Sequence, residues 1–245
     1  MGPRHYVYRR TMDGFAVPVQ TEIHVWYRSL AVSVAEREAL IALLDHDERQ
    51  RAGRFHFEAS RDAFIASHGW LRTLLGGYLN ADPGSLEFTF GSRGKPALQG
   101  TQLRFNLSHS GAMAACAVAR NEELGIDIEK IRPMSDLETI ARRFFHPEEC
   151  RKLLALSEAI RTPAFFHCWT RKEAYIKALG EGLSAPLDRF EVTLAPGEAP
   201  ALVHIDGRPA AAEWSLFGLD VGPDYAGAVA VRGTDWVVRT MGASI

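Results

Sequence analysis

The chain has 245 residues, of which 47% are hydrophobic and 24% charged, a composition typical of a globular protein with a sizeable core. A formal net charge of −2 at pH 7 argues against a general nucleic-acid binder. The first residues lack the apolar region of a signal peptide, and no apolar run is long enough to span a membrane. We therefore expect a cytoplasmic protein with neither nucleic acid nor membrane as a partner.

The first half of the chain begins with a β-rich segment and continues into helices. Ser33-Val-Ala-Glu36 is a capping box that starts a helix running to Leu44, and an amphipathic pattern predicts a long helix at about 59–79. A polar break is expected at Ser108–Gly111. The predicted strands of this half are 23–27, 88–90, 103–107 and 112–119.

The second half repeats this order, with a strand, a charged helical turn, a long helix and antiparallel strands. The long helix is expected to start at Thr162-Pro163 and to end at Gly180. The predicted elements are strand 125–129, helices at 136–145 and from 147, and strands 190–194, 201–205, 214–219, 226–231 and 235–239. The fold class is therefore α+β, with two pseudo-symmetric lobes at 1–123 and 124–245. Each lobe is expected to pack an antiparallel sheet against a long helix, with the active site in the cleft between them.

Two acidic residues alternate with isoleucines in Gly125–Glu129 (GIDIE). Side chains two residues apart on a strand share a face, so Asp127 and Glu129 lie together while the isoleucines face the core. Two adjacent carboxylates repel each other unless a cation binds between them. The alternative is an exposed edge strand with two solvated acids.

Trp169, Glu173 and Lys177 recur every four residues, so they share one helical face. Glu173 and Lys177 alone are equally typical of a surface ion pair. Together with the two acids of the strand, however, this face would supply a third carboxylate for Mg²⁺ and a cation for a phosphate.

The other polar candidates are less specific. Ser108 and His109 follow a strand and could donate to an anion, although a polar turn explains them equally well. A Ser–His hydrolase is disfavoured because no G-x-S-x-G motif is present. Lys95 lies on a glycine-rich loop that is not a P-loop, and Arg51, Arg54 and Arg61 form either a basic cluster or a solvated helix face.

Three motifs in this order, FNLSHSG, GIDIE and WxxKEAxxK, resemble the 4′-phosphopantetheinyl transferase superfamily. The similarity runs from about Asp45 to Leu183, and the length resembles the two-lobed Sfp-type branch. The resemblance implies that Asp127, Glu129 and Glu173 bind Mg²⁺, with Mn²⁺ as an alternative ion, and that Lys177 contacts the coenzyme A pyrophosphate.

The resemblance also implies a coenzyme A pocket. It assigns Lys172 to the phosphate side, Ser108 and His109 to the nucleotide, Lys95 to the same pocket and Arg51 to the 3′-phosphate. A basic residue often seen just upstream of Arg51 corresponds to Glu48, so Arg54 or Arg61 is expected to compensate.

The implied reaction moves 4′-phosphopantetheine from coenzyme A to a serine of an apo acyl or peptidyl carrier protein. It yields the holo-carrier and 3′,5′-ADP. Asp127, Glu173 and Lys177 are the expected catalytic residues, with Glu173 as the candidate base, and the protein is expected to be a monomer. The alternatives are another coenzyme A-dependent transferase and a non-catalytic module that binds carrier proteins.

Overall fold

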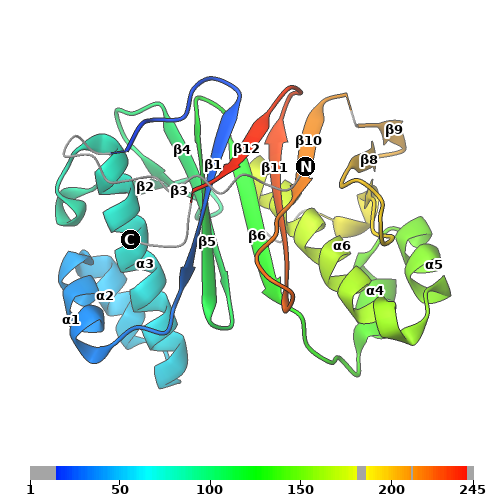
Figure 1. Cartoon of the computed structure of the whole chain (residues 1–245), viewed down its shortest axis with the longest axis horizontal. Helices are drawn as coiled ribbons and strands as arrows, with labels where there is room; N and C mark the ends of the chain where they lie inside the picture. Colours follow the sequence, from blue (N-terminus) through cyan, green and yellow to red (C-terminus); the bar gives the residue numbers. More distant parts are fainter. Residues whose placement is uncertain (1–14, 181–185, 211, 242–245) are drawn as a thin grey trace.

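The computed structural model describes residues 15–180, 186–210 and 212–241. It has an α+β fold in which helices flank central strands on both sides (Figure 1). Each of the two lobes contains one long helix of 22 residues, α3 at Glu58–Leu79 in the first lobe and α6 at Glu158–Leu179 in the second. The predicted fold class is confirmed. Within the described ranges, no helix is both long and apolar enough to cross a membrane.

The first lobe has a four-stranded sheet in the order β12-β1-β5-β4. Its main elements are β1 (Glu22–Ser29), α1 (Val34–Leu43), α2 (His46–Gly53), α3, β4 (Leu103–Ser110) and β5 (Met113–Arg120). A 3₁₀ turn at Pro83–Ser85 and the hairpin of β2 (Phe88–Phe90) and β3 (Pro96–Leu98) complete it. The capping box of α2, in which Asp45 and Glu48 satisfy each other's backbone N–H groups, makes the charged segment after Leu44 a helix.

The second lobe has a three-stranded sheet in the order β10-β11-β6. Its elements are β6 (Leu124–Lys130), α4 (Leu137–Phe144), α5 (Pro147–Ala155), α6, β7 (Phe190–Val192), β8 (Leu202–Ile205), β9 (Arg208–Pro209), β10 (Trp214–Gly218) and β11 (Tyr225–Arg232), with a 3₁₀ turn at Leu187–Arg189. Helix α6 begins at Glu158, earlier than predicted, and Pro163 lies inside the helix rather than at its start.

The last strand does not stay with the second lobe. Strand β12 (Val237–Thr240) runs parallel to β1 and extends the sheet of the first lobe (Figure 1). Met241, directly after it, is buried in the core of the first lobe. The predicted boundary near residue 124 separates β5 from β6, but the end of the chain returns to the first lobe, which corrects the assignment of 124–245 to a single lobe.

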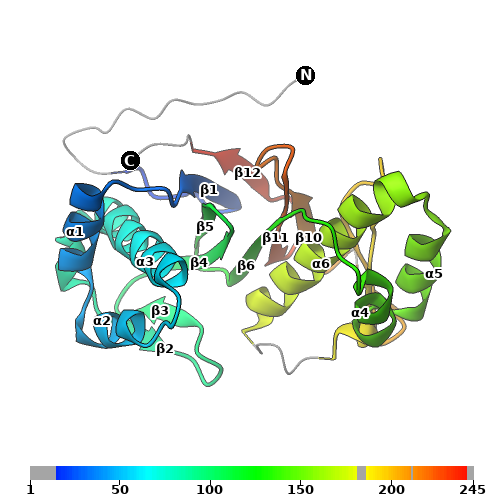
Figure 2. The same cartoon turned by 90° about the horizontal axis from the view of Figure 1, so that it is seen from below.

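The two sheets face each other between the long helices, with α3 and α6 on opposite outer sides (Figure 2). A central apolar layer joins the sheets, built from β1, β5, β6 and β11. Strand β5 presents Ala115, Ala117 and Ala119 to this layer, and these small side chains let the sheets approach closely. The layer places β4 of the first lobe beside β6 of the second.

Helix α6 lies unusually close to β6 at Gly125. A Cβ atom on Gly125 would lie 2.1 Å from the carbonyl oxygen of Ala174 and 2.3 Å from the backbone nitrogen of Ala178. Only glycine fits there, because both atoms belong to the helix backbone and cannot rotate away. The contact fixes the height of α6 above β6, and with it the position of Glu173 opposite Asp127.

We expect Gly125→Ala to lower the free energy of unfolding by at least about 3 kcal/mol, because the added methyl group would collide with backbone atoms of α6. Urea denaturation measures this change. Gly53→Ala is the control, since a Cβ atom at Gly53 meets nothing within 4 Å and should leave the unfolding free energy nearly unchanged. Equal stability of the two variants would contradict the packing argument.

Candidate active site

Three carboxylates predicted from the sequence lie in one cleft. Asp127 and Glu129 project from the same face of β6, and Glu173 projects from α6. Asp127 is 4% exposed and Glu173 is 8% exposed, while Glu129 is half-buried. Trp169 and Lys177 of α6 line the same cleft, so the repeat of four residues places these side chains on one face, as predicted.

The buried acids have too few hydrogen-bond donors. Lys177 Nζ lies 2.6 Å from Asp127 Oδ1, but Asp127 Oδ2 and Glu173 Oε1 are buried without a partner among the described residues. Burial, followed by the charge of Asp127, raises the pKa of Glu173 to about 7. Burial also raises the pKa of Asp127, despite the opposing effect of Lys177. Two unpaired carboxylate oxygens in a buried acidic cleft fit a hard divalent cation, which prefers oxygen ligands.

The third carboxylate is held slightly apart. Glu129 Oε2 accepts a hydrogen bond of 2.6 Å from Ser110. Within the part of the chain that the structure describes, no three His, Cys, Asp or Glu side chains are grouped closely enough to form a complete metal site. One or two carboxylates with substrate phosphates are the usual ligands of Mg²⁺, so the donor set fits this ion without a closed protein cage.

The hydroxyl of Ser108 binds within the acidic cleft. Ser108 Oγ donates to Asp127 Oδ1 at 2.8 Å and accepts from Lys177 Nζ at 3.2 Å and from the backbone N–H of Ile128 at 3.3 Å. One donated and two accepted bonds use the full capacity of a hydroxyl. The predicted contact of Ser108 with the nucleotide stays a prediction, and its hydroxyl is already bonded to the acidic cleft.

A second pocket opens on the side of the first lobe. Arg51 lines it, with its guanidinium 5.3 Å from the ring of Phe64, and His68 stacks on that same ring at 3.9 Å. The lining residues are Asp45, Asp47, Glu48, Arg51, His68, Leu71, Phe88, Phe90, Gly94, Pro96, Asn106 and Leu107. Aromatic rings beside cations suit a base and its phosphates. The sequence analysis missed His68, although it stands four residues after Phe64 on the amphipathic helix.

His109 lines the acidic cleft, and Arg51 and His68 of the second pocket are among its electrostatic neighbours. Its predicted contact with the nucleotide stays a prediction. Its imidazole is exposed but crowded, and this partial desolvation, followed by the charges of His68, Lys177 and Arg51, lowers its pKa. Arg51, Lys177 and the two imidazoles therefore share one electrostatic neighbourhood. Such a neighbourhood favours an anion with more than one phosphate.

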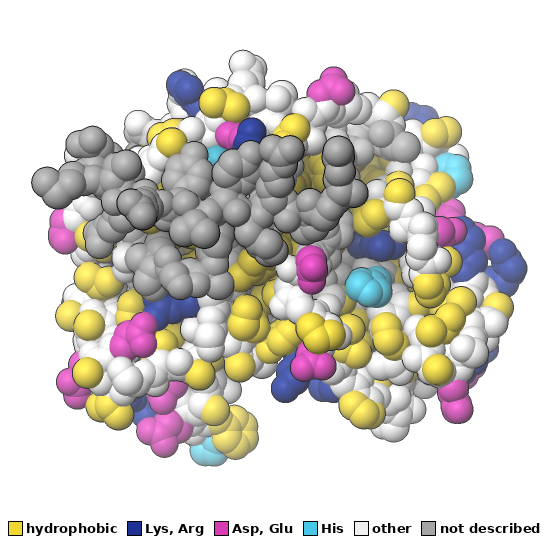
Figure 3. All heavy atoms as spheres, viewed as in Figure 1, with side chains coloured by type: hydrophobic (Ala, Val, Ile, Leu, Met, Phe, Trp, Pro, Cys, Tyr) yellow, Lys and Arg dark blue, Asp and Glu magenta, His cyan; other side chains and the backbone are white. Residues whose placement is uncertain are grey.

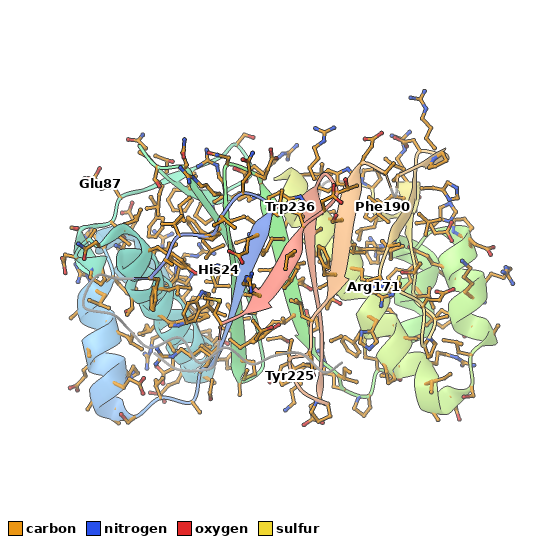
Figure 4. All side chains as sticks on the ribbon, turned by 45° about the horizontal axis from the view of Figure 1, so that its top comes forward. His24, Glu87, Arg171, Phe190, Tyr225 and Trp236 are labelled. Atoms are coloured by element: carbon orange, nitrogen blue, oxygen red, sulfur yellow. The ribbon has the colours of Figure 1, made fainter. Side chains whose placement is uncertain are left out.

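Lys172 does not face the cleft, and its predicted role at the phosphate is wrong. Its ammonium is fully buried in the second lobe, 2.8 Å from Glu149 Oε2. It also donates to the carbonyl oxygens of Leu187 and Phe190 and lies 4.1 Å from the ring centre of Phe190, which Figure 4 labels. All of these partners are buried residues of the second lobe.

The first lobe contains a counterpart of this buried pair. Arg72 on α3 is fully buried, lies 2.6 Å from Glu48 Oε2 and has its guanidinium 5.0 Å from the ring centre of Phe88. It also donates to the carbonyl oxygens of Pro83 and Leu86. In both lobes the acid is the third residue of a capped helix and the cation lies on the long helix. The predicted internal repeat is thus visible in the packing.

Two more predicted cations lie elsewhere. Lys95 Nζ lies 2.7 Å from the Glu123 carboxylate and 3.0 Å from the carbonyl oxygen of Leu124, so it connects the two lobes. Its neighbours Gly94 and Pro96 line the second pocket. Arg54 ends α2, is exposed and lines neither pocket. Arg61 pairs with Glu58 and Asp62. Their predicted phosphate contacts, and the compensation for Glu48, therefore stay predictions that this geometry does not support.

Two family models match the chain, one in each lobe. Residues 123–230 match the 4′-phosphopantetheinyl transferase superfamily, and residues 31–121 match the 4′-phosphopantetheinyl transferase N-terminal family. The 4′-phosphopantetheinyl transferase HetI of Nostoc is 43% identical over 88% of this chain and 90% of its own length. The transferase Sfp of Bacillus subtilis is 34% identical over 71% of this chain and 76% of its own length.

Solved structures of smaller synthases are similar to part of the chain. The coenzyme A complex of a holo-(acyl-carrier-protein) synthase from Bacillus anthracis is 21% identical, with a TM-score of 0.37, and covers 46% of this chain and 96% of its own. From the sequence matches, the chain belongs to the 4′-phosphopantetheinyl transferase superfamily, in its Sfp-type branch. It is an enzyme of this class.

In metal-free buffer at pH 8, we expect Glu173→Gln to raise the melting temperature by about 2–4 °C. The folded protein binds the Glu173 proton up to a pKa of about 7, above the ordinary value of 4.5, so ionisation destabilises the fold as the pH rises between these values. Thermal scans at pH 5 and pH 8 measure the effect. Glu122→Gln, at an exposed carboxylate, is the control.

Added Mg²⁺ should reverse this order, because the wild-type protein gains stability from the ion and Glu173→Gln does not. The same scans with and without Mg²⁺ measure it. An equal rise for both proteins would contradict the role of Glu173 as a ligand.

Lys172→Met alone should cost about 3–5 kcal/mol, because it leaves the Glu149 carboxylate buried without its cation. Adding Glu149→Gln should recover part of this loss, since it removes the buried unpaired charge. Its single amide oxygen can keep only one of the two bonds that the carboxylate oxygens accept from the backbone N–H groups of Val192 and His146. Urea denaturation and a carrier-loading assay on the double variant test both points. A double variant that is stable but inactive would show that Lys172 has a role in the reaction and not only in the fold.

Proposed function

We propose that this enzyme transfers 4′-phosphopantetheine from coenzyme A to a serine of an apo acyl or peptidyl carrier protein, with Mg²⁺ as its cofactor and Mn²⁺ as a substitute. One observation carries this proposal. Asp127 and Glu173 present unpaired, buried oxygens in a cleft that Lys177 and His109 also line. This arrangement suits a divalent ion and a pyrophosphate held side by side.

The first lobe would bind the nucleotide end of coenzyme A. The aromatic rings Phe88 and Phe90 line the pocket that receives the base, and Arg51 and His68 stand beside it for the 3′-phosphate. His109 lies between this pocket and the acidic cleft. The pyrophosphate would then reach Lys177, and the pantetheine arm would leave along the second lobe. The relatives HetI and Sfp are named 4′-phosphopantetheinyl transferases, which supports the proposed reaction.

The transfer forms a bond between the serine oxygen of the carrier and the phosphorus that bears the pantetheine. The bond from that phosphorus to the bridging oxygen of 3′,5′-ADP breaks, and the serine loses its proton. When bound, the metal neutralises charge on the pyrophosphate oxygens. Lys177 holds a second positive charge 2.6 Å from Asp127 and can follow the leaving phosphate.

Glu173 is the proposed acceptor of the serine proton, directly or through a water. Burial, followed by the charge of Asp127, raises its pKa to about 7 in the metal-free cleft, so the uncoordinated carboxylate is a stronger base than an ordinary glutamate. Oε1 of Glu173 is the unpaired oxygen, so it can bind either a cation or a proton. Asp127, held by Lys177 and Ser108, keeps a fixed position during the transfer.

We further propose that the enzyme acts in the cytoplasm as a monomer whose two lobes replace the subunits of a dimer. Acidic and basic side chains are interspersed over the described part of the face in Figure 3, without a large field of one sign. Recognition of an acidic carrier would therefore depend on local cations. Arg143 is a candidate on α4, whereas its neighbour Arg142 is already paired with Glu138.

Incubation with coenzyme A, Mg²⁺ and several apo-carriers should add the mass of phosphopantetheine to at least one carrier, as measured by mass spectrometry. Lys177→Ala should lower the rate by about 100-fold or more, because it removes a cation from the charge that develops on the leaving group. Arg120→Ala, at an exposed cation on β5, should leave the rate unchanged.

The outcomes separate the alternatives. Full activity in EDTA would contradict the proposed role of Mg²⁺ as the cofactor and favour another coenzyme A-dependent transferase. Carrier binding without any gain in mass would favour a non-catalytic binding module.

A further inference from the structure

The two lobes are joined by side chains where a continuous sheet would use its backbone. Asn106, Ser108 and Ser110 alternate along β4, and each accepts a hydrogen bond from a backbone N–H on the free edge of β6. The donors are Ile126, Ile128 and Lys130, at distances of 2.9, 3.3 and 3.1 Å. The separation along the chain is 20 residues each time, so the two strands run in the same direction. We call this row the seam.

Each serine of the seam also binds the carboxylate that precedes its backbone donor. Ser108 Oγ donates to Asp127 Oδ1 at 2.8 Å, and Ser110 Oγ donates to Glu129 Oε2 at 2.6 Å. A hydroxyl has one hydrogen, and its lone pairs face the N–H group of β6, so the hydrogen must point to the carboxylate. This bond fixes one oxygen of each acid and leaves the other oxygen directed away.

Asn106 occupies the same row but touches no acid, because the residue before Ile126 is Gly125. The first rung of the seam therefore only joins the lobes, while the other two rungs also hold carboxylates. At the far end, Tyr225, which Figure 4 labels on β11, accepts a hydrogen bond from the backbone of Ala112 at 3.2 Å.

We propose that Ser110 is a positioning residue for the metal site and that the site is assembled across the seam. On this view, Ser110 of the first lobe holds Glu129 of the second in the rotamer from which its other oxygen can bind the cation. The inference rests on the proposed function, because it presumes that a divalent ion binds Asp127, Glu129 and Glu173. It adds that a residue which touches neither ion nor substrate sets the metal affinity.

Three variants test this with Mn²⁺ as the probe, followed by electron paramagnetic resonance titration of the full-length protein. Ser110→Ala should weaken Mn²⁺ binding about 10-fold or more, the usual effect of removing a partner of a metal ligand. Ser110→Thr keeps the hydroxyl and should restore the affinity. Asn106→Ala should lower the melting temperature, since it leaves the N–H of Ile126 unpaired, but should change the Mn²⁺ affinity less than twofold.

Wild-type affinity in Ser110→Ala, or an equal loss in Asn106→Ala, would overturn the inference and leave the proposed function in place. A wild-type protein that binds no Mn²⁺ yet loads carriers in EDTA would overturn the inference and the proposed metal dependence, while the transfer itself would stand. Circular dichroism of each variant distinguishes a lost contact from a lost fold, and Ser110→Thr keeps the test decisive if Ser110→Ala is unstable.

Discussion

The close contact of α6 with β6 at Gly125 is the constraint on which the site depends. Because Gly125 has no side chain, the backbone of α6 packs directly against β6. This close packing brings Glu173 into the same cleft as Asp127. Two like charges are then buried together, with pKa values raised above their ordinary range. The fold thus holds the acids in an arrangement that protonation relieves and that the proposed cation would relieve further.

The paired lobes separate scaffold from chemistry. Both lobes contain a capped helix whose acid binds a buried cation on the long helix, Glu48 with Arg72 and Glu149 with Lys172. The residue after Arg72 is Thr73, whereas the residue after Lys172 is Glu173. The same buried pair therefore orients the long helix in each lobe, and only the second lobe places an acid beside it. We infer that the pair fixes the rotation of α6, which turns Glu173 toward the cleft.

Sequence reasoning located the acids because their signal is local. A strand period puts Asp127 and Glu129 on one face, and a helix period aligns Glu173 with Lys177. It misplaced Lys172 and Lys95, because the role of a cation depends on partners that are distant in sequence, such as Glu149 and Glu123. It also interpreted Ser108–Gly111 as a break, although β4 continues to Ser110. The polar residues at alternate positions of β4 are explained by the edge of β6, which no local pattern reveals.

The seam has a physical advantage over a continuous sheet. Buried N–H groups on the free edge of β6 need acceptors, and direct pairing with the backbone of β4 would satisfy them. Side-chain oxygens do so instead, and a hydroxyl, unlike a carbonyl, can also donate. Backbone pairing would have left the carboxylates of Asp127 and Glu129 without these donors. Joining the lobes through serines therefore links their assembly to the orientation of the acids, so that the first lobe contributes to a site whose carboxylates all belong to the second.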